Sequence, residues 1–398
     1  MPIRYLDAPP NAAELVIVGG GVIGAATAFH AARAGIRPLI VEARPRLCTL
    51  TTPVSAGAFR LQFDDLEELE LVRSSAAMFL DFEEATGQRE YDLALKLRGY
   101  LWLTTDPAGA EAQLELVTRL HGWGQTDVEI ISCDDVRTRW PWVSPDVVQA
   151  RWRAGDGFLD TKRLTFGLAA GANADVVTSC AATGFHVSGG RLAAVETSRG
   201  EIACAAAVIC AGPLSGVVGT AADLTLPVVT VRRQKLILPE VREVPPDAPF
   251  VIDEDTGAHW RPAYTGGAWL LFTDPTTAPM EPAADVPTDH RFAFQLLDPA
   301  SPVAVARVVP FWRDVWQRGS DHWLLQAGQY TVTPDHRPII GESSVPGLFV
   351  NTGYSGHGIM LGPAAGQVCV DLLTGASPAA ANPFRLDRAF EPRPQPTL

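Results

Sequence analysis

The stretch ELVIVGGGVIGAATAFHAARAG, residues 14–35, decides the fold. It begins with an apolar run of the length of a buried strand, and a glycine-rich segment separates this run from a helix of small residues, expected from about Ile23 to Ala34. A second apolar strand follows at 38–42. Strand, loop, helix and strand in this order predict a βαβ unit with a parallel pair of strands.

The glycine-rich segment contains the pattern G-x-G-x-x-G, placed between strand and helix as a dinucleotide site requires. Gly19 permits the tight turn, Gly21 lets the backbone approach a pyrophosphate, and Gly24 lets helix and strand pack closely. The N-terminus of the helix then offers unpaired N–H groups and a partial positive charge to the phosphates.

Glu42 ends the second strand. An acidic side chain at this place accepts hydrogen bonds from a ribose diol and disfavours a 2′-phosphate. A glycine-rich turn followed by a surface glutamate is the alternative. The motif alone does not separate NAD from FAD.

Composition excludes several classes of protein. The chain has 398 residues, of which 47% are hydrophobic and 19% charged, so we expect two domains with large cores. A net charge of −13 argues against nucleic acid and anionic membranes as partners. We find no signal-peptide pattern, no apolar run of about twenty residues and no Cys-x-x-Cys pair, and therefore expect a cytoplasmic protein without a metal site.

Further elements follow from spacing and turn residues. We expect a helix from Asp64 or Asp65 to about Ala85, a hairpin at 184–199 and a buried strand at 205–212. From 226 to 324 alternating strand patterns dominate, as in HWRPAYTGGAWLLF (259–272), and a helix is expected at 356–373. We therefore predict a discontinuous nucleotide-binding domain, 1–95, 150–225 and 325–398, and a substrate domain, 96–149 and 226–324.

Four segments carry a family resemblance: residues 326–373, QAGQYTVTPDHRPIIGESSVPGLFVNTGYSGHGIMLGPAAGQVCVDLL; 16–35 with VEA at 41–43; TTPVSAGAFR (51–60); and AAVICAG (206–212). The chain resembles the FAD-dependent D-amino-acid oxidase superfamily, in the branch that holds sarcosine oxidase, glycine oxidase and dimethylglycine dehydrogenase. The resemblance covers most of the chain and is thin at about 100–150 and 226–320. It implies an α/β fold in which an antiparallel-sheet substrate domain is inserted into a Rossmann-like FAD-binding domain.

The resemblance also implies where FAD is bound. TGYSGHG (352–358) is a glycine-rich turn that leads into a helix, and in this family that helix start faces the N1–C2=O edge of the flavin, where donors and the helix dipole favour the reduced anion. The implied FAD-binding residues are Gly19, Gly21, Val22, Ile23, Gly24, Glu42, Ala43, Arg44, Thr51, Thr52, Ser55, Ala56, Gly57, Val177, Ala211, Gly212, Gly328, Gly356, His357, Gly358 and Ile359.

Two residues match substrate-binding positions of sarcosine oxidase. Arg60 matches, across a short gap, the arginine that binds the substrate carboxylate, and its fork suits a pair of hydrogen bonds. The alternative is an arginine paired with Asp64 or Asp65. Tyr330 matches a pocket tyrosine, and the alternative is an ordinary half-buried strand residue.

Three more candidates lie on a strand expected to line the substrate pocket. Because successive side chains point to opposite faces, either His259 and Arg261 or Trp260 face the pocket; the alternative is a sheet surface without a role. The resemblance places His357 beside the flavin ring, and a structural histidine is the alternative there. His259 or His357 is a candidate for deprotonating a substrate ammonium group.

The departures from the family pattern concern charge and covalent attachment. Met360 stands where sarcosine oxidase has a carboxylate-binding lysine, and Leu270 or a neighbour stands where it has the lysine thought to activate oxygen. No lysine follows Lys235 in the chain. Gly328 replaces the cysteine that bonds the flavin, so we predict non-covalent FAD, with Cys48 as a remote alternative anchor.

These observations favour an enzyme that oxidises the C–N bond of a small amine or amino-acid-like substrate. Hydride passes to flavin N5, and the resulting imine hydrolyses. The electron acceptor is O2 or another compound, and the protein is expected to be a monomer or a homodimer. Alternatives are the tailoring of a specialised metabolite, a flavin monooxygenase, which would need a second dinucleotide site that we do not find, and an FAD-binding subunit without catalysis of its own.

Overall fold

The computed structural model describes residues 3–319 and 322–392. Its nucleotide-type half is built on a seven-stranded sheet in which all neighbouring strands are parallel except the last pair. The predicted βαβ unit is confirmed, with α1 (Val22–Arg33) as its helix. In spatial order the strands are β1 (Arg4–Tyr5), β10 (Asp175–Val177), β3 (Pro38–Val41), β2 (Leu15–Val18), β14 (Ala207–Ile209), β22 (Leu348–Thr352) and β21 (Ile339–Glu342).

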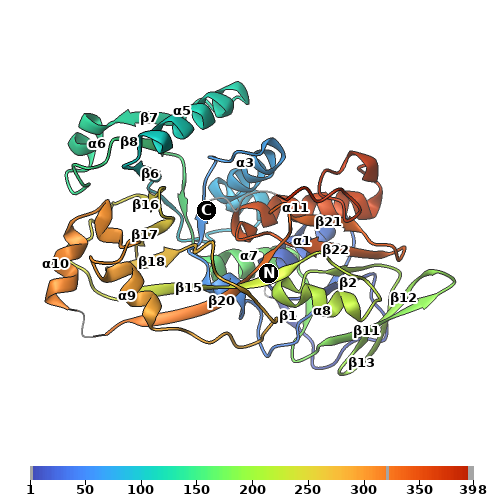
Figure 1. Ribbon diagram of the computed structural model, residues 1–398. Helices are drawn as coiled ribbons and strands as arrows, with labels where there is room; N and C mark the ends of the chain where they lie inside the picture. The colour runs from blue at the N-terminus through green and yellow to red at the C-terminus, as the bar shows by residue number, and fades with distance from the viewer. Residues whose placement is uncertain (1–2, 320–321, 393–398) are drawn as a thin grey trace.

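The central strands are apolar throughout because both faces of the sheet are covered. Leu15 and Ile17 belong to a core formed with the helices, whereas Val16 and Val18 pack on a small three-stranded sheet. The helices are α1, α3 (Leu66–Leu80), α4 (Phe82–Thr86), α7 (Thr161–Gly171) and α11 (Gly358–Thr374), and the small sheet is β11 (Ala182–Ser188), β12 (Arg191–Thr197) and β13 (Gly200–Ala203). Figure 1 shows this small sheet below the helices and main strands.

A nine-stranded, mainly antiparallel sheet forms the other half of the molecule. Trp260, Leu236 and Leu270 on one face pack with Trp312 of α10 in a second core. Helices α9 (Arg291–Leu297) and α10 (Phe311–Arg318) lie at that face (Figure 1) and were not expected from the strand-rich pattern. The strands are β19 (Pro279–Met280), β15 (Val229–Leu238), β18 (Ala268–Phe272), β17 (Ala258–Pro262), β16 (Phe250–Asp253), β6 (Tyr100–Thr104), β8 (Gln149–Arg153), β7 (Glu129–Ser132) and β20 (Leu324–Val332), which pairs with β15.

The remaining elements complete the described chain. They are α2 (Thr51–Val54), α5 (Pro107–Gly122), α6 (Cys133–Arg139), α8 (Ser215–Thr220), the 3-10 turns 212–214, 305–307 and 379–381, and a three-stranded sheet of β4 (Ala58–Phe59), β9 (Gly157–Phe158) and β5 (Lys96–Leu97).

Most expected elements are found with small shifts. The hairpin at 184–199 is confirmed as β11 and β12. The helix expected after Asp65 begins there, with the Asp65 carboxylate accepting from the Glu68 N–H, but it breaks at Asp81 into α3 and α4. The domain boundaries stay a prediction, and β8 and β20 pair within the nine-stranded sheet. Within 3–319 and 322–392, no helix is both long and apolar enough to cross a bilayer.

Helices α1 and α11 approach each other at Gly366, where a Cβ atom would lie 2.8 Å from the carbonyl carbon of Ala26. We therefore expect Gly366→Ala to lower the free energy of unfolding by about 1–3 kcal/mol, because the two backbones must move apart. Urea unfolding measures this. Gly122→Ala, where the new methyl group would meet nothing within 4 Å, is the control, and equal losses in both variants would contradict the close-packing argument.

Candidate functional site

A long cleft of about 300 Å³ follows the carboxyl ends of β2, β3 and β14. Ligands of open α/β sheets bind at this edge, where the loops diverge. Its walls come from six segments far apart in the sequence, within 18–23, 41–55, 181–182, 210–218, 329–331 and 351–359.

The glycines of the first loop are required by close approach. A Cβ atom on Gly24 would lie 1.9 Å from the Gly19 carbonyl oxygen. Gly19 itself has a φ of 115°, and a Cβ there would lie 2.5 Å from the Cys210 carbonyl oxygen. The N-cap of α1, Gly21, offers no side-chain cap, and no acidic residue lies in the first turn. The start of α1 therefore presents N–H groups and a partial positive charge to the cleft.

Glu42 follows the last residue of β3, at the strand end where it was predicted, and its side chain binds two backbone N–H groups of the neighbouring loops. One carboxylate oxygen accepts from the Gly20 N–H at 2.7 Å and the other from the Arg44 N–H at 2.8 Å. Burial raises the pKa of Glu42, and the two backbone N–H groups oppose that shift. The carboxylate is thereby held at the cleft wall with lone pairs left for a hydroxyl donor.

The structure gathers most of the predicted cofactor-binding residues on this cleft. Those that line it are Gly19, Gly21, Val22, Ile23, Glu42, Ala43, Thr51, Thr52, Ser55, Ala211, Gly212, Gly356, Gly358 and Ile359. Those outside its lining are Gly24, Arg44, Ala56, Gly57, Val177, Gly328 and His357. Val177, for example, is fully buried, and its carbonyl accepts from the Glu42 N–H.

Sequence reasoning missed parts of the wall. Among them are the start of β11 at 181–182 and, second, the turn and helix at 213–218. The predicted strand at 205–212 closes on a Gly-Pro turn, and this turn was the available signal for the second segment.

A second, smaller cavity of about 60 Å³ adjoins the cleft. The two share five lining residues, which are Ser55, Tyr330, Ser355, Gly356 and Ile359. The nine-stranded sheet contributes Tyr100, Phe250, His259 and Leu271 to the far wall, and Thr273 follows β18 there. The smaller cavity is thus a chamber between the two halves of the molecule.

Arg60 lies in this chamber and is almost fully buried, with 4% of its surface exposed. It donates towards the sulfur of Met360 at 3.7 Å and towards Nε2 of His357 at 3.5 Å. Its guanidinium carbon is 4.7 Å from the centre of the Phe63 ring. Burial lowers the pKa of Arg60, but arginine stays charged, so the chamber contains a desolvated cation.

His259 faces the chamber and Trp260 does not, so the structure decides between the two alternatives for this strand. Arg261 shares the face of His259 but lies outside the chamber lining; its guanidinium donates to the Ala56 carbonyl at 2.9 Å and stacks 3.8 Å from the Trp269 ring centre. Tyr330 lines both cavities, and burial raises its pKa.

The chamber has few cationic groups for a substrate anion. Met360 and Leu271 line it, whereas Leu270 packs in the opposite core. Lys235, opposite Leu271 in the sheet, donates to the carbonyls of Pro53 at 3.2 Å and Ser55 at 3.3 Å. Burial lowers the pKa of Lys235 to about 7. These two hydrogen bonds fix the loop at residues 53–55, and Ser55 of this loop lines both cavities.

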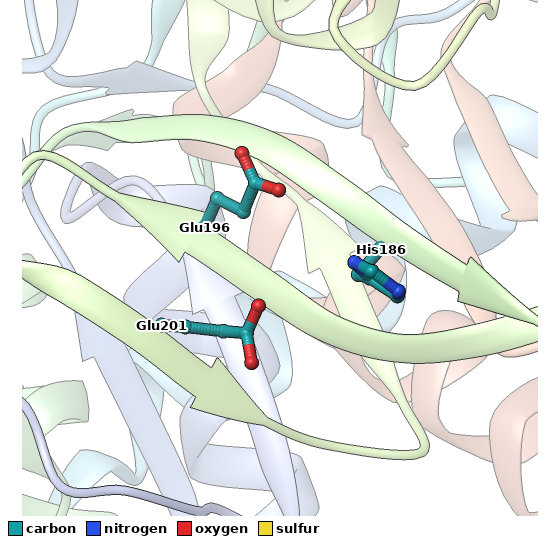
Figure 2. Close-up of side chains that lie close together, drawn as sticks. All are labelled: His186, Glu196 and Glu201. Carbon is teal, nitrogen blue, oxygen red and sulfur yellow. The ribbon is translucent and has the colours of Figure 1, made fainter.

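One group of metal-ligand side chains lies in the described part of the chain, away from both cavities. His186, Glu196 and Glu201 project from β11, β12 and β13, with ligand atoms within 4.8 Å of one another (Figure 2). All three are exposed. Because exposed acidic groups are common without an ion, the sequence prediction of no metal site stays a prediction.

Burial of His259 makes the stability depend on pH. Burial, with a smaller contribution from Arg60, lowers its pKa from 6.5 to about 4. The unfolded chain therefore takes up a proton between pH 6.5 and 4 that the folded protein does not, and stability falls as pH falls, by at most about 3 kcal/mol. We expect His259→Asn to flatten this part of the profile in urea unfolding. The exposed His290, changed to Asn, is the control, and an unchanged slope in His259→Asn would contradict the argument.

The chain is similar to known flavoproteins over most of its length. It is 26% identical to mitochondrial sarcosine dehydrogenase of Mus musculus over 378 residues, 90% of this chain but 39% of that protein. It is also 26% identical to glycine oxidase of Pseudomonas putida over 382 residues, 92% of this chain and 95% of that protein. The chain thus spans well under half of the sarcosine dehydrogenases that it matches.

Solved structures show the same fold. Glycine oxidase from Geobacillus kaustophilus aligns with a TM-score of 0.82 at 23% identity, over 96% of this chain and 100% of that one. L-proline dehydrogenase from P. horikoshii aligns with a TM-score of 0.81 at 21% identity, over 94% and 96%. The DAO family model, described as FAD dependent oxidoreductase, matches residues 14–372. The chain therefore belongs to the DAO family of FAD-dependent oxidoreductases.

Proposed function

We propose that the protein uses FAD to oxidise a C–N bond of a small amine or amino-acid-like substrate, whose carboxylate pairs with Arg60. One observation carries this proposal: a buried arginine lies in a chamber that shares a wall with the cofactor cleft. A desolvated guanidinium strongly favours a carboxylate partner. The relatives named for sarcosine, dimethylglycine and glycine, all amino acids, support the same substrate class.

The cleft fits FAD on three counts. Its glycine loop leaves no room for side chains at Gly19 and Gly24, and Glu42 lines the wall where a ribose would lie. Helix α11, like α1, begins without a side-chain cap or an acidic first turn. Two helix N-termini near one cleft suit a pyrophosphate and an anionic flavin edge. We propose the lining residues 19–23, 42–43, 51–55 and 211–212 as FAD contacts.

The residues of the chamber would orient the substrate. FAD, when bound, supplies the oxidising power by taking up a hydride. Arg60 would hold the carboxylate, and the rings of Tyr100 and Phe250, stacked 4.4 Å apart, would exclude water from the reacting carbon. The amine must be neutral to donate a hydride, so a substrate that arrives as an ammonium ion must first lose a proton. The imine product then hydrolyses in water.

The electron acceptor, O2 or another compound, is left open by this chamber. Met360 and Leu271 line the chamber and carry no charge. The resemblance places Met360, and Leu270 or a neighbour, where sarcosine oxidase has lysines, which favours a dehydrogenase or a slow oxidase. A cytoplasmic location and a monomeric or dimeric state stay predictions.

The substrate class is tested by anaerobic titration of the FAD-loaded protein with N-methyl, cyclic and D-amino acids. We expect at least one to bleach the flavin absorbance, because the carboxylate and amine place a hydride-donating carbon near the cofactor. Bleaching by NADPH and by none of the amines would overturn the proposal in favour of a monooxygenase.

The role of Arg60 is tested by changing its charge. We expect Arg60→Met to weaken binding of a reactive amino acid by about 100-fold, since a charge-assisted pair is lost, while an amine without a carboxylate binds equally to both proteins. Stopped-flow flavin reduction gives both constants. Arg163→Met removes a largely exposed arginine that pairs with Asp92 and is the control. Equal weakening for both kinds of amine would contradict the assignment.

We also propose that FAD is bound without a covalent bond. A Cβ atom on Gly328 would lie 3.4 Å from Val54, so this position packs on α2 and carries no thiolate. Cys48 lines the cleft, but burial raises its pKa to about 11, which keeps the thiol protonated and unreactive. Acid precipitation of the protein is expected to leave FAD in the supernatant. Flavin that stays with the pellet would identify a covalent link.

A further inference from the structure

The imidazole of His357 lines the smaller chamber, and a buried carboxylate outside that lining lies next to it. Glu68 on α3 and His357 at the start of α11 expose 5% and 6% of their surfaces. Oε1 of Glu68 lies 3.8 Å from Nδ1 of His357. Each of these two atoms is buried without a hydrogen-bond partner among the described residues. Two unsatisfied polar atoms of complementary type at this distance form a hydrogen bond after a small side-chain rotation.

The tautomer of His357 follows from its other neighbour. Arg60 lies 3.5 Å from Nε2 of the ring, and an arginine can only donate. Nε2 must therefore accept, so the single proton of the neutral ring is on Nδ1. That N–H points towards Glu68 and leaves the Nε2 lone pair facing the chamber. This is the arrangement in which a carboxylate orients an imidazole as a base.

Charged groups lie near both nitrogens of His357. Arg60, which directly follows β4, lies near Nε2, and Glu68 from α3 lies near Nδ1. The residue is also the N-cap of α11, at the positive end of that helix. Tyr100 and Tyr330 line the chamber, and burial raises the pKa of both, so both stay neutral.

Two further titratable residues, Asp65 at the start of α3 and His259 in the chamber lining, are already engaged. Asp65, one turn before Glu68, is engaged by Arg337 at 3.3 Å. His259 donates from Nδ1 to the Gly257 carbonyl at 2.8 Å, and its pKa of about 4 makes it a poor proton acceptor at neutral pH.

We propose that Glu68 and His357 form a proton-accepting pair that binding of the substrate carboxylate switches on. This inference rests on the proposed function. When the carboxylate pairs with Arg60, the guanidinium turns away from Nε2 and its charge is neutralised. Nε2 then accepts the proton of the substrate ammonium. The N–H bond of the ammonium breaks, its electron pair stays on the amine nitrogen, and the proton forms a new N–H bond on the imidazole beside Glu68.

The arrangement links two steps that the reaction needs in order. Without a substrate, Arg60 occupies the Nε2 lone pair of His357. A ligand with a carboxylate draws Arg60 away from Nε2, and only a ligand that also carries an ammonium group can then transfer a proton to it. His357 touches the substrate and is a catalytic residue in this scheme. Glu68 acts through the ring and is a positioning residue.

The pair is tested by proton titration of His357 in the FAD-loaded protein, followed by NMR of ring-labelled histidine and assigned with His357→Asn. We expect Glu68→Gln to lower the pKa of His357 by at least about one pH unit, because the neighbouring negative charge is lost. Acetate, as a carboxylate without an amine, should raise that pKa in the wild-type protein. Glu70→Gln removes an exposed carboxylate of the same helix and should leave the titration unchanged.

Three results would overturn the inference: no shift in Glu68→Gln, no effect of acetate, or a ring that does not titrate between pH 5 and 10 with acetate present. A second readout is the pH profile of flavin reduction by an amine that bleaches it. Glu68→Gln should move the acid limb to lower pH and slow the limiting rate about tenfold, whereas Glu70→Gln should change neither.

The two proposals fail separately. The NMR titration needs no turnover, so a shifted titration without reduction by any amine would leave the pair standing and remove the amine oxidation. If an amine reduces the flavin but the His357 titration does not shift in Glu68→Gln, the amine oxidation stands and the proton-accepting pair is ruled out.

Discussion

The rest of the structure depends on the contact between Gly24 and the carbonyl of Gly19, where even one methyl carbon would lie only 1.9 Å from the oxygen. This contact fixes where α1 begins relative to β2. Further along, α1 touches α11 at Gly366 with a similar lack of space. Two close backbone contacts therefore hold both helices with their first turns near one cleft. The positive ends of the two helices then act on whatever anion occupies it.

The second organising feature is the alternation of side chains on the nine-stranded sheet. Trp260 and Leu270 fill a core with α10, and their neighbours His259 and Leu271 face the chamber. The same strands therefore supply stability on one face and the substrate wall on the other. Around the chamber the charges are buried and few, so each one has a large effect on its neighbours. Arg60 is cationic and desolvated; it lies next to Nε2 of His357, and Glu68 lies next to Nδ1 of the same ring.

The sequence predicted the nucleotide-binding βαβ unit well because the residues that form it are neighbours in the chain. Strand, glycine turn, helix and terminal glutamate are consecutive, and each step of the motif has a steric reason. The substrate half was harder to predict. Which of His259 and Trp260 faces inwards depends on which face of the sheet α10 covers, and that helix was not predicted within the strand-rich segment 226–324.

Glu68 was missed for a related reason. In the sequence it is one of several acidic residues on an amphipathic helix, and only the packing of α3 against the start of α11 brings it to His357. Arg44, Gly57 and Val177, which the resemblance implies as cofactor contacts, lie outside the lining of the cleft, and their role stays a prediction. The Arg44 N–H donates to the Glu42 carboxylate at the cleft wall.

The claim of C–N oxidation is tested most directly by product analysis of a single anaerobic turnover in ¹⁸O-labelled water. An amine that bleaches the flavin is mixed with the FAD-loaded protein, and the products are identified by mass spectrometry. The account predicts one carbonyl product per FAD reduced, with its oxygen taken from water, because the imine hydrolyses. A product that keeps its C–N bond while a different bond has been oxidised would contradict it.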